Sequence, residues 1–191
     1  NQTCSAMARV QLKYYDQRTA EIRKAMKYFW SLLKGVPGLR AHMVDESDGS
    51  NMAGWYAPHG LYCPEELEGL SVERFCEAVQ AEGFGTTPGA NKALHLHNIF
   101  KDYNGLNYDK PARVAFTDRD VRNLDEGITV SQQVQVYSIP WFKHYMPEYI
   151  EMYANAFKKV ALNYKELLAG DEKRGTESGR WFFYTDKKEK K

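Results

Sequence analysis

The stretch that decides the fold runs from Val136 to Val160 and reads VYSIPWFKHYMPEYIEMYANAFKKV. A short apolar run, expected to form a strand, ends at Ile139-Pro140, and an aromatic turn follows it. Pro147 then stands where the first turn of a helix tolerates a residue without an N–H donor. Behind it, apolar residues recur at helical spacing, which predicts an amphipathic helix with one buried face. That face comprises Ile150, Tyr153, Phe157, Val160, Tyr164 and Leu167.

The N-terminal part of the chain predicts one long helix over residues 3–34. Apolar residues recur at helical spacing as far as Leu33, charged residues stand between them, and Gly35 ends the pattern. At about 1.5 Å per residue such a helix measures about 48 Å, which exceeds what a small domain needs. We therefore expect its first half, including Met7 and Val10, to pack against another part of a larger protein and to be exposed without it.

The middle of the chain predicts short strands and one capped helix. Residues 45–54 are polar and indicate a loop. Residues 55–57 and 61–63 flank a Pro-His-Gly sequence and form either one interrupted strand or a hairpin. Ser71 can cap the helix that follows it, and residues 84–88 offer a short strand. These elements indicate an α+β domain with a mainly antiparallel sheet of about three strands, covered by helices.

The composition is that of an ordinary folded protein, with 43% hydrophobic and 27% charged residues. A formal net charge of +1 gives no reason to expect nucleic acid or an anionic membrane as a partner. No apolar run reaches the length of a membrane span, and no signal-peptide pattern is present at the start. Cys4, Cys63 and Cys76 lack a metal-like spacing and indicate free thiols in a reducing compartment, so a cytoplasmic protein is expected.

Candidate binding residues cluster in the loop that begins after residue 89. On an extended segment, His95 and His97 share one face, so they can contact one ligand, or backbone carbonyls can satisfy them. Asn91 lies on the same loop and can bind a polar group. No metal site is predicted, because zinc needs three or four ligands and no second His or Cys pair is present. Residues 83–89 are Gly-rich but lack the Gly-Lys-Ser/Thr ending of a phosphate loop, which favours a strand and turn.

Four blocks of the chain resemble one family in the same order. Residues 136–160 resemble the closing pattern "slPwf.hy.pe.ie.ya.AfrKv" of DegT/DnrJ/StrS-type aminotransferases, which use pyridoxal phosphate (PLP) to aminate keto-sugars and keto-cyclitols. Residues 70–83, LSVERFCEAVQAEG, and 94–100, LHLHNIF, resemble two further segments of that family. Residues 9–18 resemble the helix that leaves its large domain. The resemblance spans roughly residues 2–168 and implies the small C-terminal domain of a fold-type-I PLP enzyme.

The resemblance implies how the chain is divided and what it does. It implies a connecting helix over residues 1–34, a substrate domain over 35–169 that closes the substrate cleft, and a charged linker with an aromatic, lysine-rich tail over 170–191. It places His95, His97 and Asn91 at the substrate mouth. It also implies that the Schiff-base lysine and the other cofactor ligands lie upstream of Asn1, so this chain is expected to hold no catalytic or cofactor-binding residue.

For the intact enzyme, the resemblance implies PLP as cofactor, a nucleotide-sugar or cyclitol as substrate, and a homodimer. The alternative is a non-catalytic small-molecule binding or interaction module that lacks the cofactor domain. One feature stands outside both interpretations. The aromatic run Trp181–Tyr184 is too apolar to remain in water, so we expect it to dock as an edge strand or on an apolar face.

Overall fold

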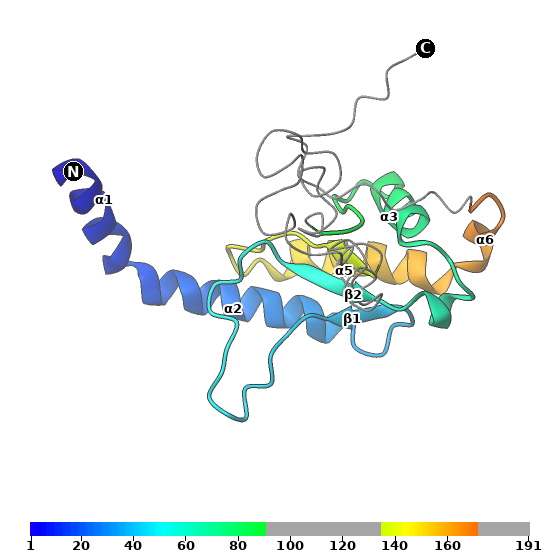
Figure 1. Ribbon diagram of the computed structural model, residues 1–191, viewed down its shortest axis with the longest axis horizontal. Coiled ribbons are helices and arrows are strands. Elements are labelled where there is room, and N and C mark those ends of the chain that lie inside the picture. The colour runs from blue at the N-terminus through cyan, green and yellow to red at the C-terminus, as the bar shows by residue number, and fades with distance from the viewer. Residues whose placement is uncertain (91–134, 172–191) are drawn as a thin grey trace, which may run out of the picture.

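The computed structural model describes residues 1–90 and 135–171. Its α-helices and three-stranded antiparallel sheet confirm the predicted α+β class. The elements, labelled as in Figure 1, are α1 (Gln2–Lys13), α2 (Tyr15–Leu32), β1 (Leu39–Ala41), β2 (His59–Tyr62), the 3₁₀ helix η1 (Pro64–Leu67), α3 (Val72–Ala81), β3 (Val136–Ser138), α5 (Pro147–Leu162) and α6 (Lys165–Leu168).

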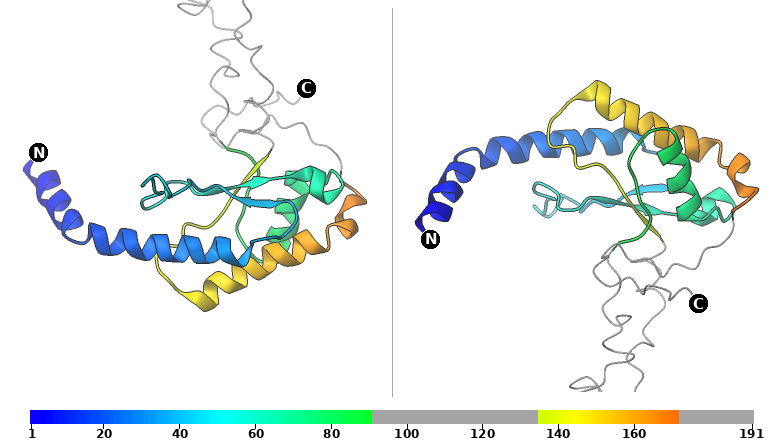
Figure 2. Two further views of the ribbon diagram at one scale, coloured as in Figure 1. Left: turned by 90° about the horizontal axis from the view of Figure 1, so that it is seen from below. Right: turned by 90° about the horizontal axis from the view of Figure 1, so that it is seen from above.

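The sheet has the order β1-β2-β3, and both strand pairs are antiparallel. Leu39 pairs with Tyr62 across the first two strands, and His59 pairs with Ser138 across the second two. Helices α2, α3 and α5 lie on one side of the sheet (Figure 2). The sheet and these helices therefore form the two layers of one domain. The helical layer combines α2 and α3 from residues 1–90 with α5 from residues 135–171.

A cluster of aromatic side chains fills the space between the two layers. Phe157 of α5 lies at its centre, with ring centroids 5.9 Å from Phe29, 6.0 Å from Phe75 and 5.7 Å from Tyr137. Phe157, Phe29, Phe75 and Tyr137 are all fully buried. Because these four rings come from α2, α3, β3 and α5, one cluster holds the described parts of the fold together.

Helix α3 begins at the cap that the sequence predicts, and a glycine follows its end. The Ser71 hydroxyl accepts a hydrogen bond from the Arg74 N–H at 3.1 Å, which satisfies one of the free donors at the helix start. Gly83 follows the last turn with φ +91°, a conformation that favours glycine. Asp171 adds a second interaction at the start, because its carboxylate accepts from the Ser71 N–H at 2.7 Å and also from the Ser71 hydroxyl.

The predicted single helix over residues 3–34 is wrong, because it breaks at Tyr14. Tyr14 has φ −110° and ψ 5°, so α1 ends before it and α2 starts after it. Two adjacent aromatic residues favour the helix weakly, and α1 has no buried residue that would offset this. The two halves therefore lie on different axes, and α1 projects beyond the body of the fold (Figure 1).

The first half of this region exposes its apolar side chains, as predicted. Met7 is 59% exposed and Val10 is 56% exposed. The second half behaves differently, because Met26 and Phe29 of α2 are fully buried against the rest of the fold. That another part of a larger protein covers the apolar face of α1 stays a prediction.

Two predicted strands are shorter than the sequence suggests. Residues 55–57 do not extend β2, because Trp55 and Ala57 have positive φ angles of 48° and 47°, which no strand accommodates. Residues 84–88 run beside β3 but form only one bridge, between Pro88 and Tyr137. Proline has no N–H to continue the ladder. The C-terminal helix also ends early, at Leu162, and the short α6 follows it.

Candidate functional site

A cavity of about 520 Å³ opens where β2 begins and β3 ends. It lies between the last turn of α3, the extended residues 85–87 and the first half of α5. We call it the hydroxyl cavity because most of its polar lining groups are hydroxyls. These polar lining residues are His59, Gln80, Thr86, Thr87, Ser138 and Tyr153.

Thr86, Thr87 and Ser138 form one hydrogen-bonded unit on the cavity wall. The Thr86 hydroxyl donates to the Ser138 carbonyl at 2.7 Å, and the Thr87 N–H donates to the Ser138 hydroxyl at 2.9 Å. The Thr87 and Ser138 hydroxyls lie 3.1 Å apart. Gln80 fixes the same unit from α3, since its amide donates to the Thr86 carbonyl at 2.6 Å. The hydroxyls are thus held in place before any ligand arrives, which reduces the entropic cost of binding.

The hydrogen bond of His59 with Ala57 determines which of its ring nitrogens carries the proton. Its Nδ1 lies 2.6 Å from the Ala57 carbonyl oxygen, which can only accept a hydrogen bond. Nδ1 therefore carries a proton, and in the neutral ring Nε2 is the acceptor. The lining of the cavity thus combines one imidazole with hydroxyl and amide groups, a set that suits a ligand rich in hydroxyl groups.

Tyr153 closes the cavity from α5 and remains a neutral phenol. Burial raises the pKa of its hydroxyl, and the hydrogen bond with Tyr149 raises this pKa further. The two hydroxyl oxygens lie 3.5 Å apart. The Tyr153 ring packs edge-to-face on Phe84 with centroids 4.6 Å apart, which holds its position. A phenol with a raised pKa keeps its proton at neutral pH and can donate a hydrogen bond to a ligand.

The backbone that leads into the cavity is strained. Ala53, Trp55 and Ala57 all have φ between 45° and 48°, a left-handed conformation that side chains other than glycine rarely adopt. Two tertiary interactions hold this segment in place. Trp55 is buried, with 5% of its surface exposed, and the Trp141 indole donates a hydrogen bond to the Gly54 carbonyl at 2.8 Å. Such strain costs about 1–3 kcal/mol per residue and concentrates at functional sites.

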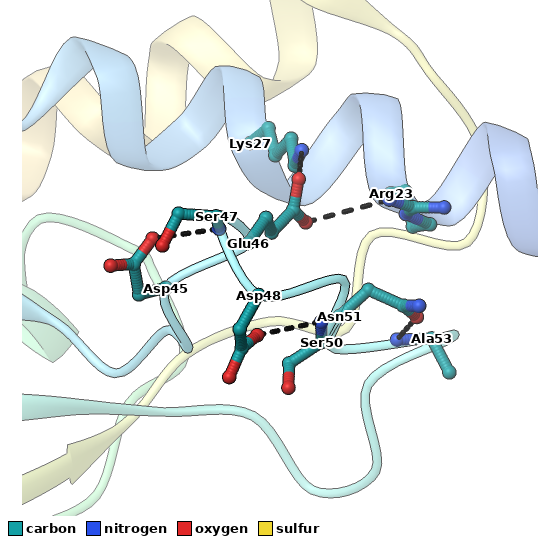
Figure 3. A network of polar contacts seen from close by, with 9 residues as sticks. All are labelled: Arg23, Lys27, Asp45, Glu46, Ser47, Asp48, Ser50, Asn51 and Ala53. Atoms are coloured by element: carbon teal, nitrogen blue, oxygen red, sulfur yellow. Dashed lines mark hydrogen bonds and ion pairs between the residues drawn. The ribbon is translucent and has the colours of Figure 1, made fainter.

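Residues 45–51 precede the strained segment, and Glu46 holds them against α2 (Figure 3). The Glu46 carboxylate lies 2.5 Å from Lys27 Nζ and 3.4 Å from Arg23. Asp45 and Asp48 each accept a hydrogen bond from the backbone N–H two residues later, at 2.9 and 2.8 Å. These interactions lower the pKa of all three carboxyl groups: the contact with Lys27 is the main cause for Glu46, and the backbone hydrogen bonds for the two aspartates.

Acid is therefore expected to loosen this loop, and Glu46→Gln isolates one part of the effect. A folded-state pKa below its ordinary value of 4.5 stabilises the fold above that pH and stops doing so as the pH falls through the lowered pKa. We expect the stability advantage of wild type over Glu46→Gln to be largest at pH 7 and to shrink as the pH falls below 4.5, as measured by urea unfolding. The exposed Glu65→Gln is the control. A difference that is as large at pH 3 as at pH 7 would contradict the assignment.

The predicted binding residues Asn91, His95 and His97 lie outside the described residues. The structure does place the two ends of the segment that carries them. The Gly89 N–H donates to the Val136 carbonyl at 2.8 Å, and the Tyr62 N–H donates to the Gln135 carbonyl at 2.7 Å. The chain thus leaves and re-enters the described part beside β3. Thr86 and Thr87, on the cavity wall, come shortly before the point of departure.

Comparison with known proteins places the chain in a family. The family model described as DegT/DnrJ/EryC1/StrS aminotransferase matches residues 1–121, which is well over half of the chain. The chain belongs to this family. The matched part of this DegT/DnrJ/EryC1/StrS aminotransferase chain includes α1 to α3 and both cavity threonines, but not β3 or α5. None of the curated proteins compared with it matches the chain.

The hydroxyl cavity does not fit PLP, on which DegT/DnrJ/EryC1/StrS aminotransferases generally depend. A PLP site needs a lysine for the Schiff base and a partner for the pyridine nitrogen. No lysine, arginine or carboxylate is among the described residues that line this cavity. Within residues 1–90 and 135–171, no group of three His, Cys, Asp or Glu side chains is placed to hold a metal ion. No described helix has both the length and the apolar character needed to cross a bilayer.

Sequence reasoning missed the hydroxyl cavity of this member of the DegT/DnrJ/EryC1/StrS aminotransferase family. It interpreted residues 83–89 only as a strand and turn, and it assigned no binding role to His59. The adjacent Thr86 and Thr87 in a Gly-rich stretch were the one local signal. Their partner Ser138 lies 51 residues beyond Thr87, and no local pattern connects residues at that separation.

Proposed function

We propose that this chain supplies the substrate-binding side of a PLP-dependent aminotransferase that acts on keto-sugar nucleotides or keto-cyclitols. In this proposal the chain corresponds to the small C-terminal domain of a fold-type-I enzyme and closes the substrate cleft. The reaction class is the transfer of an amino group onto a ketone carbon. Because none of the described residues that line the hydroxyl cavity is a lysine, we expect no transamination from this chain alone.

The hydroxyl cavity is the observation that carries the proposal. Thr87, Ser138 and Gln80 offer hydroxyl and amide groups, which can both donate and accept hydrogen bonds, as sugar and cyclitol hydroxyls do. Tyr153 adds an aromatic ring and a neutral phenol at the same wall. A volume of about 520 Å³ accommodates one six-membered ring with its substituents. The match to an aminotransferase family supports the same reaction class.

Two further parts of the proposal concern the intact protein. We propose that it is a homo-oligomer, because the apolar face of α1 around Met7 and Val10 has no partner within the described residues. We propose that it works in the cytoplasm, since Cys4, Cys63 and Cys76 are all free thiols. Neither nucleic acid nor a membrane is part of the proposal.

Ligand binding at the cavity is the direct test. We expect 2-keto-myo-inositol or a uridine-diphosphate 4-keto-hexose, added to the ¹⁵N-labelled chain, to shift the amide resonances of Thr86, Thr87 and Ser138. Thr87→Val keeps the side-chain shape and removes one hydroxyl, so it should weaken binding about fivefold, which corresponds to one hydrogen bond of about 1 kcal/mol.

Thr19→Val is the matched control, because Thr19 is partly buried in α2 and does not line the cavity. It should bind as wild type does. If neither compound shifts the three amides at millimolar concentration, or if Thr87→Val binds as tightly as wild type, the hydroxyl cavity is not the acceptor site.

A further inference from the structure

A second groove lies on the other side of α3, away from the hydroxyl cavity. It has a volume of about 530 Å³ and runs between α3, the end of α5 and α6. Its floor is apolar and its rim is charged. We call it the α3–α6 groove. Its floor consists of Ala78, Ala81, Val160 and Leu167, and its charged rim of Arg74, Glu77, Glu82, Lys159 and Glu166.

The chain leaves the described part of the structure beside this groove. Helix α6 forms one wall, and Asp171 follows it within three residues. The Asp171 carboxylate accepts hydrogen bonds from Ser71, the N-cap residue of α3, one of them at 2.7 Å from its N–H. Asp171, the last described residue, therefore lies at the N-terminal end of the helix that forms the opposite wall.

The aromatic run Trp181–Tyr184 is within reach of every part of the α3–α6 groove. Trp181 lies ten residue steps beyond Asp171 along the chain. At about 3.3 Å per residue they can span about 33 Å. Helix α3 has ten residues, which correspond to about 15 Å of helix. The connection is therefore long enough to bring the run back along α3 to Glu82.

Charge favours the same arrangement. Residues 172–191 contain seven basic and four acidic residues, and Arg180, Lys187 and Lys188 flank the aromatic run. The groove rim carries three carboxylates against two cations. Lys159 is already paired with Glu82 at 2.8 Å, whereas Glu166 stands on the exposed wall formed by α6. A cationic aromatic segment thus matches an apolar floor with an acidic rim.

We propose that Trp181–Tyr184 docks in the α3–α6 groove of its own chain, with the flanking basic residues on the acidic rim. Docking removes four consecutive aromatic side chains from water, and it covers Ala78, Ala81 and Leu167 at the same time. In this proposal the C-terminal segment contacts both α3 and α6 and stabilises their packing, in addition to the hydrogen bonds of Asp171 with Ser71.

Hydrogen–deuterium exchange of the full chain tests the proposal. The change is the fourfold variant Trp181→Ala, Phe182→Ala, Phe183→Ala and Tyr184→Ala. We expect the backbone amides of α3 and α6 to exchange at least fivefold faster in this variant than in wild type, because their outer face loses its cover. The amides of α1 and β1 should exchange at unchanged rates. Unchanged rates in α3 and α6, or a change at α1 or β1 instead, would overturn the proposal.

A second measurement alters the groove and follows the tail. Ala81→Arg places a long cation on the floor from an exposed position of α3. We expect it to shift the ¹⁹F resonance of 5-fluorotryptophan at Trp181 towards the free indole position. Ala20→Arg, an exposed helical alanine of α2, is the matched control and should leave this resonance unchanged. An unmoved resonance in Ala81→Arg would contradict docking.

The same experiments separate the chain's own tail from a second copy. Intramolecular docking gives protection of α3 and α6 that does not change with protein concentration. Protection that rises over a hundredfold range of concentration, together with dimer formation in sedimentation velocity, would assign the groove to another molecule and overturn the proposal.

Discussion

Phe157→Ala is expected to lower the free energy of unfolding by about 4 kcal/mol, the typical cost of removing a fully buried phenylalanine ring. Phe157 contacts Phe29, Phe75 and Tyr137, so its loss opens a cavity where α2, α3, β3 and α5 meet. Because small domains have about 5–15 kcal/mol of stability, the variant should be close to unfolding at 37 °C. Urea denaturation followed by circular dichroism measures the difference.

Met152→Ala on the same helix is the control. Met152 is 57% exposed, so its substitution should change the free energy of unfolding by less than about 0.5 kcal/mol. If Phe157→Ala costs no more than Met152→Ala, the aromatic cluster does not hold the fold together.

Gly60→Ala is expected to cost about 3 kcal/mol, because the added methyl group has no space. A Cβ at this position would lie 2.5 Å from the Tyr137 hydroxyl and 2.7 Å from Trp30, and it would also contact the Tyr137 ring. Tyr137 is fully buried and Trp30 is 6% exposed, so neither ring can move without disturbing the core. Thermal and urea unfolding measure the loss.

Gly54→Ala is the matched control in a nearby segment. Its Cβ would make only an ordinary contact, 3.8 Å from Ile22, and its φ is outside the left-handed region. It should be as stable as wild type within about 0.5 kcal/mol. Equal stability of Gly60→Ala and Gly54→Ala would mean that the sheet has room to separate from the helices.

The elements that could be predicted from the sequence are those whose signals are local. The Ser71 cap, the glycine after α3 and the proline in the first turn of α5 act within one helical turn, so residues 71–83 and the start of α5 were predicted correctly. The break at Tyr14 accompanies a helix α1 without any buried residue, and periodicity does not reveal burial. Helical spacing continues through Tyr14 although the helix does not.

Which side chain of the aromatic turn is buried could also not be predicted from the sequence. Trp141 and Phe142 are adjacent, and either can serve as the anchor. The structure buries Phe142 to 4% exposure and leaves Trp141 at 40%, with its indole used to hold Gly54. The hydroxyl cavity depends on the same kind of information, because the strain at Ala57 and the pairing of residues 86 and 138 arise only when distant segments meet.

The hydrogen bond between Gly89 and Val136 has a consequence for how this protein can change. Gly89 and Val136 lie on either side of residues 91–134, and their hydrogen bond holds them together beside β3. The two described residues that adjoin this 44-residue segment, Ala90 and Gln135, are therefore anchored close to one another. Loop-closure entropy grows only slowly with length, by about 0.6 kcal/mol per doubling. A change in the length of residues 91–134 therefore leaves both anchor points in place and adds little to the entropic cost of joining them.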